Sequence, residues 1–255
     1  MITILSPAKI MDFKNPSPLP DYSQPEFLKE AGRLIKLMQN LDMSELSKLL
    51  DINSNLTQLN FDRIFNWHQP FTLANSKQAA YVFDGEAYRG LDAKTLTKED
   101  MDFAQQHLRL LSGLYGILRP LDLIQAYRLE VSTKLNNPAG KDLYAFWQEK
   151  VTKSILRALK ESGETQVLLN LASNEYFKTL RAASFKSKVI DVEFYEYKND
   201  QFKQIVIYTK KARGMMARYV IENRINQLED LKGFHADGYW YNPAMSTDNK
   251  LVFAR

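Results

Sequence analysis

Apolar residues recur along this chain with two different spacings, one typical of helices and one typical of strands. Helical spacing covers residues 26–40, 142–159 and 212–225. Short unbroken apolar runs of strand length occupy residues 2–5 and 167–171. Because helical and strand patterns alternate to the end of the chain, the sequence predicts an α/β fold.

Capping and turn residues add further elements. Ser44 predicts the start of a second helix, and Thr97 with Asp100 predicts a capping box ahead of another. Residues 189–197 and 202–208 flank a turn-forming KNDQ sequence, which predicts an antiparallel hairpin and hence a mixed sheet. No repeat or Gly/Ser linker divides the 255 residues, so we expect a single compact domain over residues 1–255, with helices flanking the sheet.

Residues 102–128 form the most informative segment. A helix-period stretch leads into the glycine-framed turn Gly113-Leu114-Tyr115-Gly116, with Arg109 and Arg119 on either side of it. This arrangement is similar to a helix-hairpin-helix, in which glycines let the backbone approach a phosphate closely. We therefore expect both arginines and the turn to contact the backbone of a nucleic acid.

Two features leave a second interpretation of this segment open. Two residues separate the glycines, one more than in the usual hairpin, and Pro120 falls where the second helix should begin. The alternative is a helix that ends at Gly113 and is followed by a buried strand or turn.

A second basic cluster lies in YTKKARG, residues 208–214, where the pattern changes from strand to helix. Positive charge near a helix start opposes the helix dipole, so local helix stability does not account for Lys210, Lys211 and Arg213. An anion bound at this place would account for them. The alternative is a solvated basic face.

Other candidate chemistry lies near the first strand and in one polar loop. Lys9 directly follows residues 2–5, and ligands bind at the carboxyl ends of strands in α/β sheets. Lys9 is therefore placed to meet an anion or to act as a nucleophile, although a solvated lysine is the simpler interpretation. Asp84 and Glu86 could supply a general acid, or they could be ordinary turn residues. The sequence leaves enzymatic activity open.

Composition excludes several classes of site. The chain has no cysteine, and its 3 histidines lie far apart without a metal-binding spacing. No phosphate-binding glycine loop of the Walker or dinucleotide type occurs, so we expect neither a metal nor a cofactor. The first residues lack a signal-peptide pattern, and no apolar stretch reaches the roughly 18–20 residues of a membrane span. We expect a cytoplasmic protein without a membrane or protein partner, whose net charge of +4 permits an anionic one.

Several segments match a known family in order along the chain. They are SPAK at residues 6–9, FDGEAYRGL at 83–91, residues 102–130, GKDLYAFW at 140–147, NLASNEYF at 170–177 and YTKKARGMMARYVIENR at 208–224. Together they resemble the YaaA family of peroxide-stress-resistance proteins. The resemblance implies an α/β fold with a helix-hairpin-helix and a positively charged cleft. It also implies DNA binding and protection against hydrogen peroxide by lowering free iron. Lys9, Lys210, Lys211 and Arg213 match the family's motifs.

The leading hypothesis is a DNA-binding protein of the oxidative stress response that contacts the nucleic-acid backbone with little base specificity. The alternative is an enzyme that cleaves or transfers at a base–sugar bond of a nucleic acid or nucleotide, using Lys9 with Asp84 and Glu86. A third hypothesis, direct iron handling, lacks a ligand cluster in the sequence. An enzyme requires Lys9, Glu86 and residues 210–213 to line one cleft, whereas their dispersal would leave only a binding surface.

Overall fold

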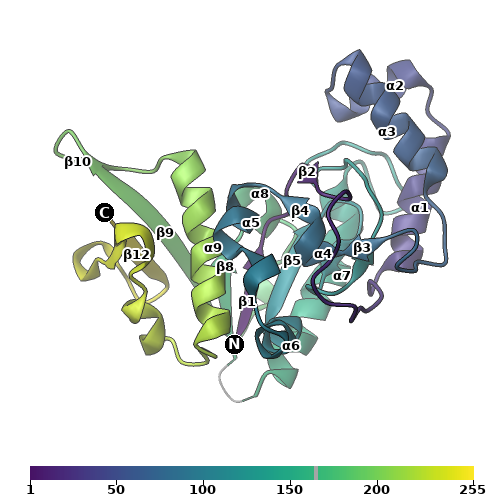
Figure 1. Cartoon of the computed structure of the whole chain (residues 1–255). Coiled ribbons are helices and arrows are strands. Elements are labelled where there is room, and N and C mark those ends of the chain that lie inside the picture. Colours follow the sequence, from purple (N-terminus) through teal and green to yellow (C-terminus); the bar gives the residue numbers. More distant parts are fainter. Residues whose placement is uncertain (164–165) are drawn as a thin grey trace.

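The computed structural model describes residues 1–163 and 166–255 and has an α/β architecture (Figure 1). The main sheet has the strand order β11-β12-β9-β8-β1-β5-β6, and β10 pairs with β9. The strands are β1 (Ile2–Leu5), β2 (Ile10–Met11), β3 (Lys77–Gln78), β4 (Phe83–Asp84), β5 (Leu108–Ser112), β6 (Gly116–Leu118), β7 (Leu123–Ile124), β8 (Val167–Leu171), β9 (Lys188–Lys198), β10 (Gln201–Lys203), β11 (Trp240–Tyr241) and β12 (Lys250–Ala254). The helices are α1 (Leu28–Gln39), α2 (Met43–Leu50), α3 (Ser54–Asn66), α4 (Ala79–Val82), α5 (Glu86–Leu91), α6 (Lys98–His107), α7 (Leu143–Glu161), α8 (Asn174–Phe177) and α9 (Val206–Glu222).

The predicted mixed sheet is confirmed. β1 pairs in parallel with both β5 and β8, whereas β6 and β10 pair antiparallel with β5 and β9. Every residue of β1 and β8 is buried, which requires cover on both faces of the sheet. The short β9–β10 turn places Asn199 and Asp200 at positive φ angles, as a tight hairpin turn requires.

Helix boundaries differ from the prediction in two places. Asp42, not Ser44, caps α2, because its side chain accepts a hydrogen bond from Glu45 N while the Glu45 carboxylate accepts one from Asp42 N. The last long helix, α9, begins at Val206 and not at position 212, since β10 ends at Lys203. Residues 206–208 are therefore the first turn of a helix and not the end of a strand.

The predicted helix-hairpin-helix-like element does not form at residues 102–128, which instead contain the end of a helix and a β hairpin. α6 ends at His107, and the next residues make β5, which is hydrogen-bonded between β1 and β6. A short run of buried leucines fits a helix and an interior strand equally well by periodicity, and here the strand forms. Gly113 to Tyr115 are the buried turn of a β hairpin whose second strand begins at Gly116, and Leu123–Ile124 forms a strand where a second helix was predicted.

Gly113 has a packing role in this hairpin. A Cβ atom added at position 113 would lie 2.0 Å from the carbonyl oxygen of Leu129. Only glycine therefore lets the segment around Leu129 and Glu130 cross over the turn at this distance. The turn that contains Gly113 thus packs directly against the backbone of Leu129 and Glu130.

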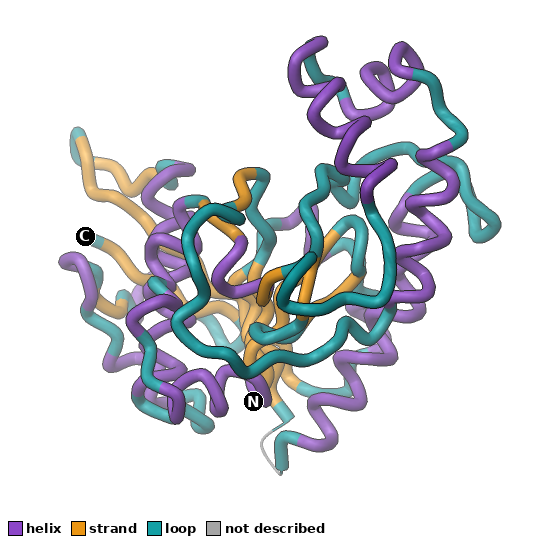
Figure 2. Tube along the Cα trace, turned by 45° about the vertical axis from the view of Figure 1, so that its right-hand side comes forward, coloured by secondary structure: helices purple, strands orange, loops and turns teal. Residues whose placement is uncertain are grey.

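Helices α1, α2 and α3 form an arm that projects from the body of the molecule (Figure 2). The arm is held at its base by α1, whose buried face contains Ala31, Leu34, Ile35 and Met38. The predicted helix over residues 26–40 is confirmed here, and the arm forms one wall of a groove described below.

Candidate functional site

A pocket of about 490 Å³ opens where β1 and β8 end. We call it the main pocket. Its lining comes from segments far apart in sequence, namely residues 5–11, 84–88 and 127–130, together with Leu171, Ser173, Glu175, Tyr176, Lys210 and Arg213. This is the edge at which parallel α/β sheets bind ligands, and the volume is in the range of small-molecule sites, roughly 300–1,000 Å³.

Close backbone contacts bring these segments together. Helices α5 and α9 cross so tightly that a Cβ atom at position 214 would lie 1.7 Å from the carbonyl oxygen of Ala87. The absence of a side chain at Gly214 therefore sets Lys210 and Arg213 beside the Asp84–Glu86 loop. Gly113 does the same for Leu129 and Glu130, as described above.

An ion pair spans the main pocket. Lys9 Nζ lies 2.7 Å from Glu130 Oε1, and Arg128 Nη2 lies 3.7 Å from the same oxygen. Glu130 therefore faces two cations, and the exposed Lys9 side chain is paired with a carboxylate. Asp84 and Glu86 line the same pocket but are paired with Arg89, at 3.4 Å and 2.5 Å. The arrangement leaves Glu130, not Asp84 or Glu86, as the carboxylate that contacts Lys9.

Arg213 carries a buried charge that lacks a hydrogen-bonding partner. Its Nε atom is buried and makes no hydrogen bond. Burial lowers the pKa of the Arg213 guanidinium, and the nearby carboxylates of Glu193 and Asp191 oppose that shift. Because arginine remains protonated near neutral pH, a full positive charge faces the main pocket.

Tyrosines and serines form the polar part of the pocket floor. Tyr88 OH donates to the carbonyl oxygen of Ser6 at 3.1 Å, and Tyr127 OH lies 2.7 Å from Ser112 Oγ. Burial raises the pKa of Tyr88, Tyr127 and Tyr176 above the ordinary value. These phenols are therefore neutral near pH 7, with a planar ring for stacking and a hydroxyl for hydrogen bonds.

A second, larger hollow adjoins the main pocket, with a volume of about 1110 Å³. We call it the side groove. It shares Lys9, Arg128 and Glu130 with the main pocket and continues between the α1–α2 part of the arm and residues 132–136. Exposed Lys48 and Lys134 lie along it. The two hollows form one continuous depression.

Several predicted nucleic-acid contacts lie elsewhere. Leu114 and Tyr115 are completely buried, and Gly113 and Gly116 are buried with them. Burial lowers the pKa of Arg109 to about 10, and its guanidinium donates to the carbonyl oxygens of Gln105 and Leu108. In this conformation residues 113–116 present no surface to a duplex, and Arg109 is partly buried with its guanidinium bonded to the backbone.

Arg119 is committed to a structural ion pair. Its Nη2 lies 3.0 Å from Oδ1 of the buried Asp122, and its backbone N–H donates to Oδ2 of the same carboxylate at 2.7 Å. It borders a separate hollow together with Arg109 and Arg157. The hairpin arginines thus lie away from Lys9 and Arg213.

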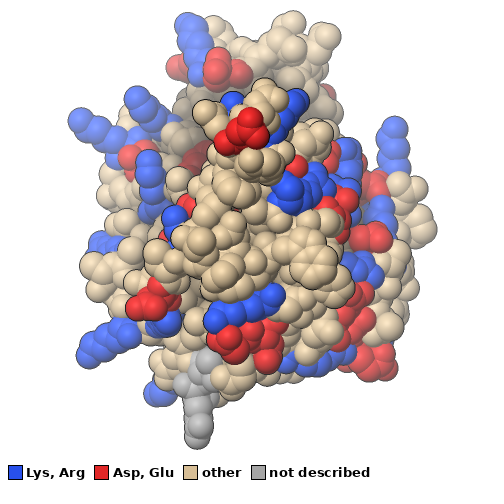
Figure 3. Space-filling view, turned by 90° about the vertical axis from the view of Figure 1, so that its left-hand side faces the viewer, with Lys and Arg blue, Asp and Glu red and all other residues tan. Residues whose placement is uncertain are grey.

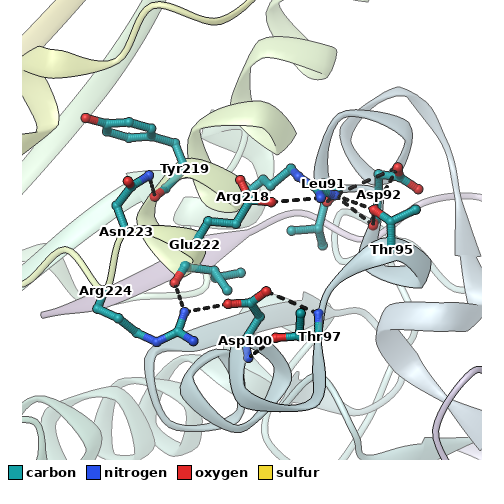
Figure 4. Close-up of polar contacts among 11 residues, drawn as sticks. Leu91, Asp92, Thr95, Thr97, Asp100, Arg218, Tyr219, Glu222, Asn223 and Arg224 are labelled. Carbon is teal, nitrogen blue, oxygen red and sulfur yellow. Dashed lines mark hydrogen bonds and ion pairs between the residues drawn. The ribbon is translucent and has the colours of Figure 1, made fainter.

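The second basic cluster divides in the same way. Lys210 and Arg213 line the main pocket, whereas Lys211 pairs with Asp237 at 3.5 Å. Figure 4 shows Arg218 directed at the end of α5, where it donates to Leu91 O, Asp92 O and Thr95 Oγ1. Arg224 reaches Asp100 at 2.7 Å. Both of these later arginines join α9 to the α5–α6 region.

The surface beyond the pocket is not one basic face. Figure 3 shows the side of the molecule that carries β10 and β12, where Lys and Arg side chains alternate with Asp and Glu. Val206, Ile207 and Trp240, from α9 and β11, are exposed apolar side chains. Within residues 208–214, Lys210 is exposed, Arg213 is partly buried and Lys211 is paired with Asp237.

Sequence reasoning missed Glu130 and gave no site role to Arg128 or Tyr127. All three fall within residues 102–130, the segment for which the sequence predicts phosphate contacts at the glycine-framed turn. The signal was the polar pair Arg128 and Glu130 on either side of buried Leu129, an alternation that points alternate side chains away from the core.

Two further observations concern the described part of the chain. No three His, Asp or Glu side chains are grouped there so that they could hold a metal ion. None of the helices in residues 1–163 and 166–255 has both the length and the apolar character needed to cross a membrane.

Comparison with known proteins gives matches that cover nearly the whole chain. Residues 1–245 match the model of a family described as peroxide stress protein YaaA. The chain is also 46% identical over 255 residues to a UPF0246 protein of Alteromonas mediterranea, covering 100% of this chain and 98% of that protein. The family resemblance of the sequence segments is thereby confirmed.

Proposed function

Because the chain belongs to the peroxide stress protein YaaA family, we propose that it binds nucleic acid in the main pocket and the side groove. Membership of the family gives the chain a role in the oxidative stress response. Within the proposal, protection against peroxide and iron damage acts through the nucleic acid that the protein holds.

One observation carries the proposal: four cations from three distant segments converge on one pocket. Lys9 follows β1, Arg128 lies before the crossover at Leu129, and Lys210 with Arg213 comes from α9. Phosphate groups are the partners that clustered lysines and arginines recognise in nucleic acids. Glu130 is close to two of these cations, Lys9 and Arg128. Among the described residues, Lys210 and Arg213 have no ion pair, so their charges are available to a ligand.

The side groove supports a polymeric ligand over a small one. It continues from Lys9 and Arg128 past Lys48 and Lys134, so that cations lie at intervals along it, although Glu45 and Asp51 also belong to its lining. A strand lying along it would meet cations at successive phosphates. The buried hairpin takes no part in this contact, and the proposed binding residues are Lys9, Arg128, Lys210 and Arg213.

The test is a salt titration of nucleic-acid binding by fluorescence anisotropy, with a labelled duplex and a labelled single strand. The double variant Lys9→Ala/Lys210→Ala should bind more weakly to every sequence. For the duplex, the slope of log affinity against log salt should fall by roughly 0.9 for each lost phosphate contact. Lys153→Ala is the matched control, because Lys153 is 74% exposed and, among residues 1–163 and 166–255, its ammonium group pairs only with Glu149, which is also on α7. Salt-independent binding, or identical slopes for all variants, would contradict the proposal.

A second candidate is catalysis at a base–sugar bond, and one observation favours it. Lys9 and Glu130 lie 2.7 Å apart in a pocket that also contains Tyr88 and Tyr176. A flipped nucleotide needs such an enclosed, aromatic pocket, with an acid–base pair at the bond to be broken. Release of free base from an oligonucleotide with an oxidised base, measured by chromatography and lost in Lys9→Met and Glu130→Gln, would support this candidate. No release by the unmodified chain would exclude it for that substrate.

A further inference from the structure

Two arginines that line the main pocket each have a buried Nε atom without a hydrogen-bond partner. In the described part of the chain, Arg128 Nε and Arg213 Nε are the buried side-chain nitrogens in this state. Both residues line the main pocket. A buried cationic donor without a partner is costly, and native structures ordinarily satisfy such groups. Because both incompletely paired guanidinium groups belong to residues that line one cavity, an acceptor group of a ligand could bind to both.

The neighbouring carboxylates of Arg213 are held by other groups. Asp191 Oδ1 accepts a hydrogen bond from Asn170 Nδ2 at 2.7 Å. Glu193 Oε2 accepts one from Tyr195 OH at 3.0 Å and lies 3.4 Å from Lys250 Nζ. These carboxylates act on Arg213 through their charge without filling its hydrogen-bonding positions. The guanidinium is left for an outside acceptor.

Arg128 is in a similar position. Its contact with Glu130 is made by Nη2 at 3.7 Å, beyond ordinary hydrogen-bond length, and Lys9 holds the same oxygen at 2.7 Å. The Nε–H of Arg128 is not used in that contact. A phosphate suits two guanidiniums better than a carboxylate does, because it offers more acceptor oxygens and more negative charge.

The remainder of the pocket suits the organic part of a nucleotide. Its lining includes Tyr127 and Tyr176 with Pro7, Met11 and Leu171. Neutral phenol rings and aliphatic side chains favour stacking with a base over solvation of a bare ion.

We propose that the main pocket is the subsite for one nucleoside monophosphate unit, whose phosphate is bound by Arg213 and Arg128 and whose base lies against the tyrosines. This inference rests on the proposed nucleic-acid binding and names the unit that enters the pocket. The same chemistry has two sources, a nucleotide of a strand lying in the side groove and a free nucleotide.

Calorimetric titration with dAMP, deoxyadenosine and inorganic phosphate tests the subsite. The unmodified chain should bind dAMP at least 10-fold more tightly than either fragment. Arg213→Gln and Arg128→Gln should each weaken dAMP binding at least 10-fold. Arg181→Gln is the matched control, since the exposed Arg181 side chain donates a hydrogen bond to Gln148 and is not part of the pocket lining. Equal dAMP affinity in Arg213→Gln and the unmodified chain would overturn the inference.

Thermal unfolding without ligand separates binding from a structural role. Arg213→Gln should keep or raise the melting temperature, because it removes a partly buried charge that has no hydrogen-bond partner within the fold. A marked loss of stability would show that Arg213 serves the fold, and would count against the subsite.

Competition between dAMP and a labelled oligonucleotide with one unpaired nucleotide shows whether the pocket takes a nucleotide of a strand or a free nucleotide. Displacement of the oligonucleotide assigns the pocket to a nucleotide of the strand, and dAMP binding without displacement assigns it to the free nucleotide. If the oligonucleotide binds and dAMP does not, the subsite is wrong and nucleic-acid binding stands. If dAMP binds and no nucleic acid does, the proposed function is wrong and the subsite stands.

Discussion

Lys9 and Glu130, which are 121 positions apart in the chain, meet at 2.7 Å across the main pocket. The contact joins the loop after β1 to the segment that crosses over the β5–β6 turn. Since Lys9 is 59% exposed at its side chain, the pair contributes little to stability, and its importance lies in where it places the two charges.

Replacing Glu130 tests that placement directly. Glu130→Gln removes the negative charge that faces Lys9 and Arg128, so affinity for DNA and the salt slope should both increase. The free energy of unfolding should change by less than about 1 kcal/mol, as for other partly exposed ion pairs. Anisotropy titrations and urea melts measure the two effects. Weaker DNA binding by a variant of unchanged stability would show that Glu130 contacts the ligand itself.

The glycine of the hairpin should be intolerant of any side chain. Gly113→Ala places a Cβ atom against the backbone of residues 129 and 130, which should cost about 1–3 kcal/mol and displace Glu130. Gly32→Ala is the comparison, because a Cβ there meets its neighbours at ordinary distances of 3.5 Å and α1 gains helix propensity. Chemical denaturation measures both. Equal stabilities would mean that the crossover at Leu129 can shift without cost.

Arg218 should behave oppositely to Arg213. Arg218→Ala removes the donor to Leu91 O, Asp92 O and Thr95 Oγ1, which should destabilise the fold by about 1–3 kcal/mol. The salt slope for DNA should stay the same, because Arg218 lies outside the two hollows that hold the proposed binding residues. Thermal melts with parallel anisotropy titrations distinguish the cases. A stable Arg218→Ala variant with weakened binding would extend the binding surface to this arginine.

Stability should depend on pH through His107. Burial lowers the pKa of His107 below its ordinary value, and the hydrogen bond that its Nδ1 donates to Met1 O only partly opposes that shift. As the pH falls through about 6.5, the unfolded chain binds this proton before the folded chain does, so stability decreases with falling pH. Urea melts between about pH 7 and 5 should show a smaller decrease in His107→Gln. An unaltered pH profile would exclude His107 as the source.

The sequence alone determined the α/β class, the mixed sheet and the main amphipathic helices. Periodicity located α1 and α7, and the apolar runs located β1 and β8. These elements follow from local patterns, because the apolar side chains of each segment must all face the core, and their spacing along the chain then reflects helix or strand geometry. The motif at residues 6–9 and the cluster at 208–214 likewise pointed to Lys9, Lys210 and Arg213 before their proximity was visible.

Only the tertiary structure decided between helix and strand at residues 108–118. Consecutive buried leucines carry no period, so the choice depended on β1, whose edge offers hydrogen bonds to β5. The structure also decided which arginines find hydrogen-bond acceptors within the fold. Arg119 and Arg218 find acceptors in the fold, whereas Arg128 and Arg213 keep an unpartnered nitrogen at the main pocket. Such pairing depends on residues up to 127 positions away, as between Arg218 and Leu91, and a linear pattern does not contain that information.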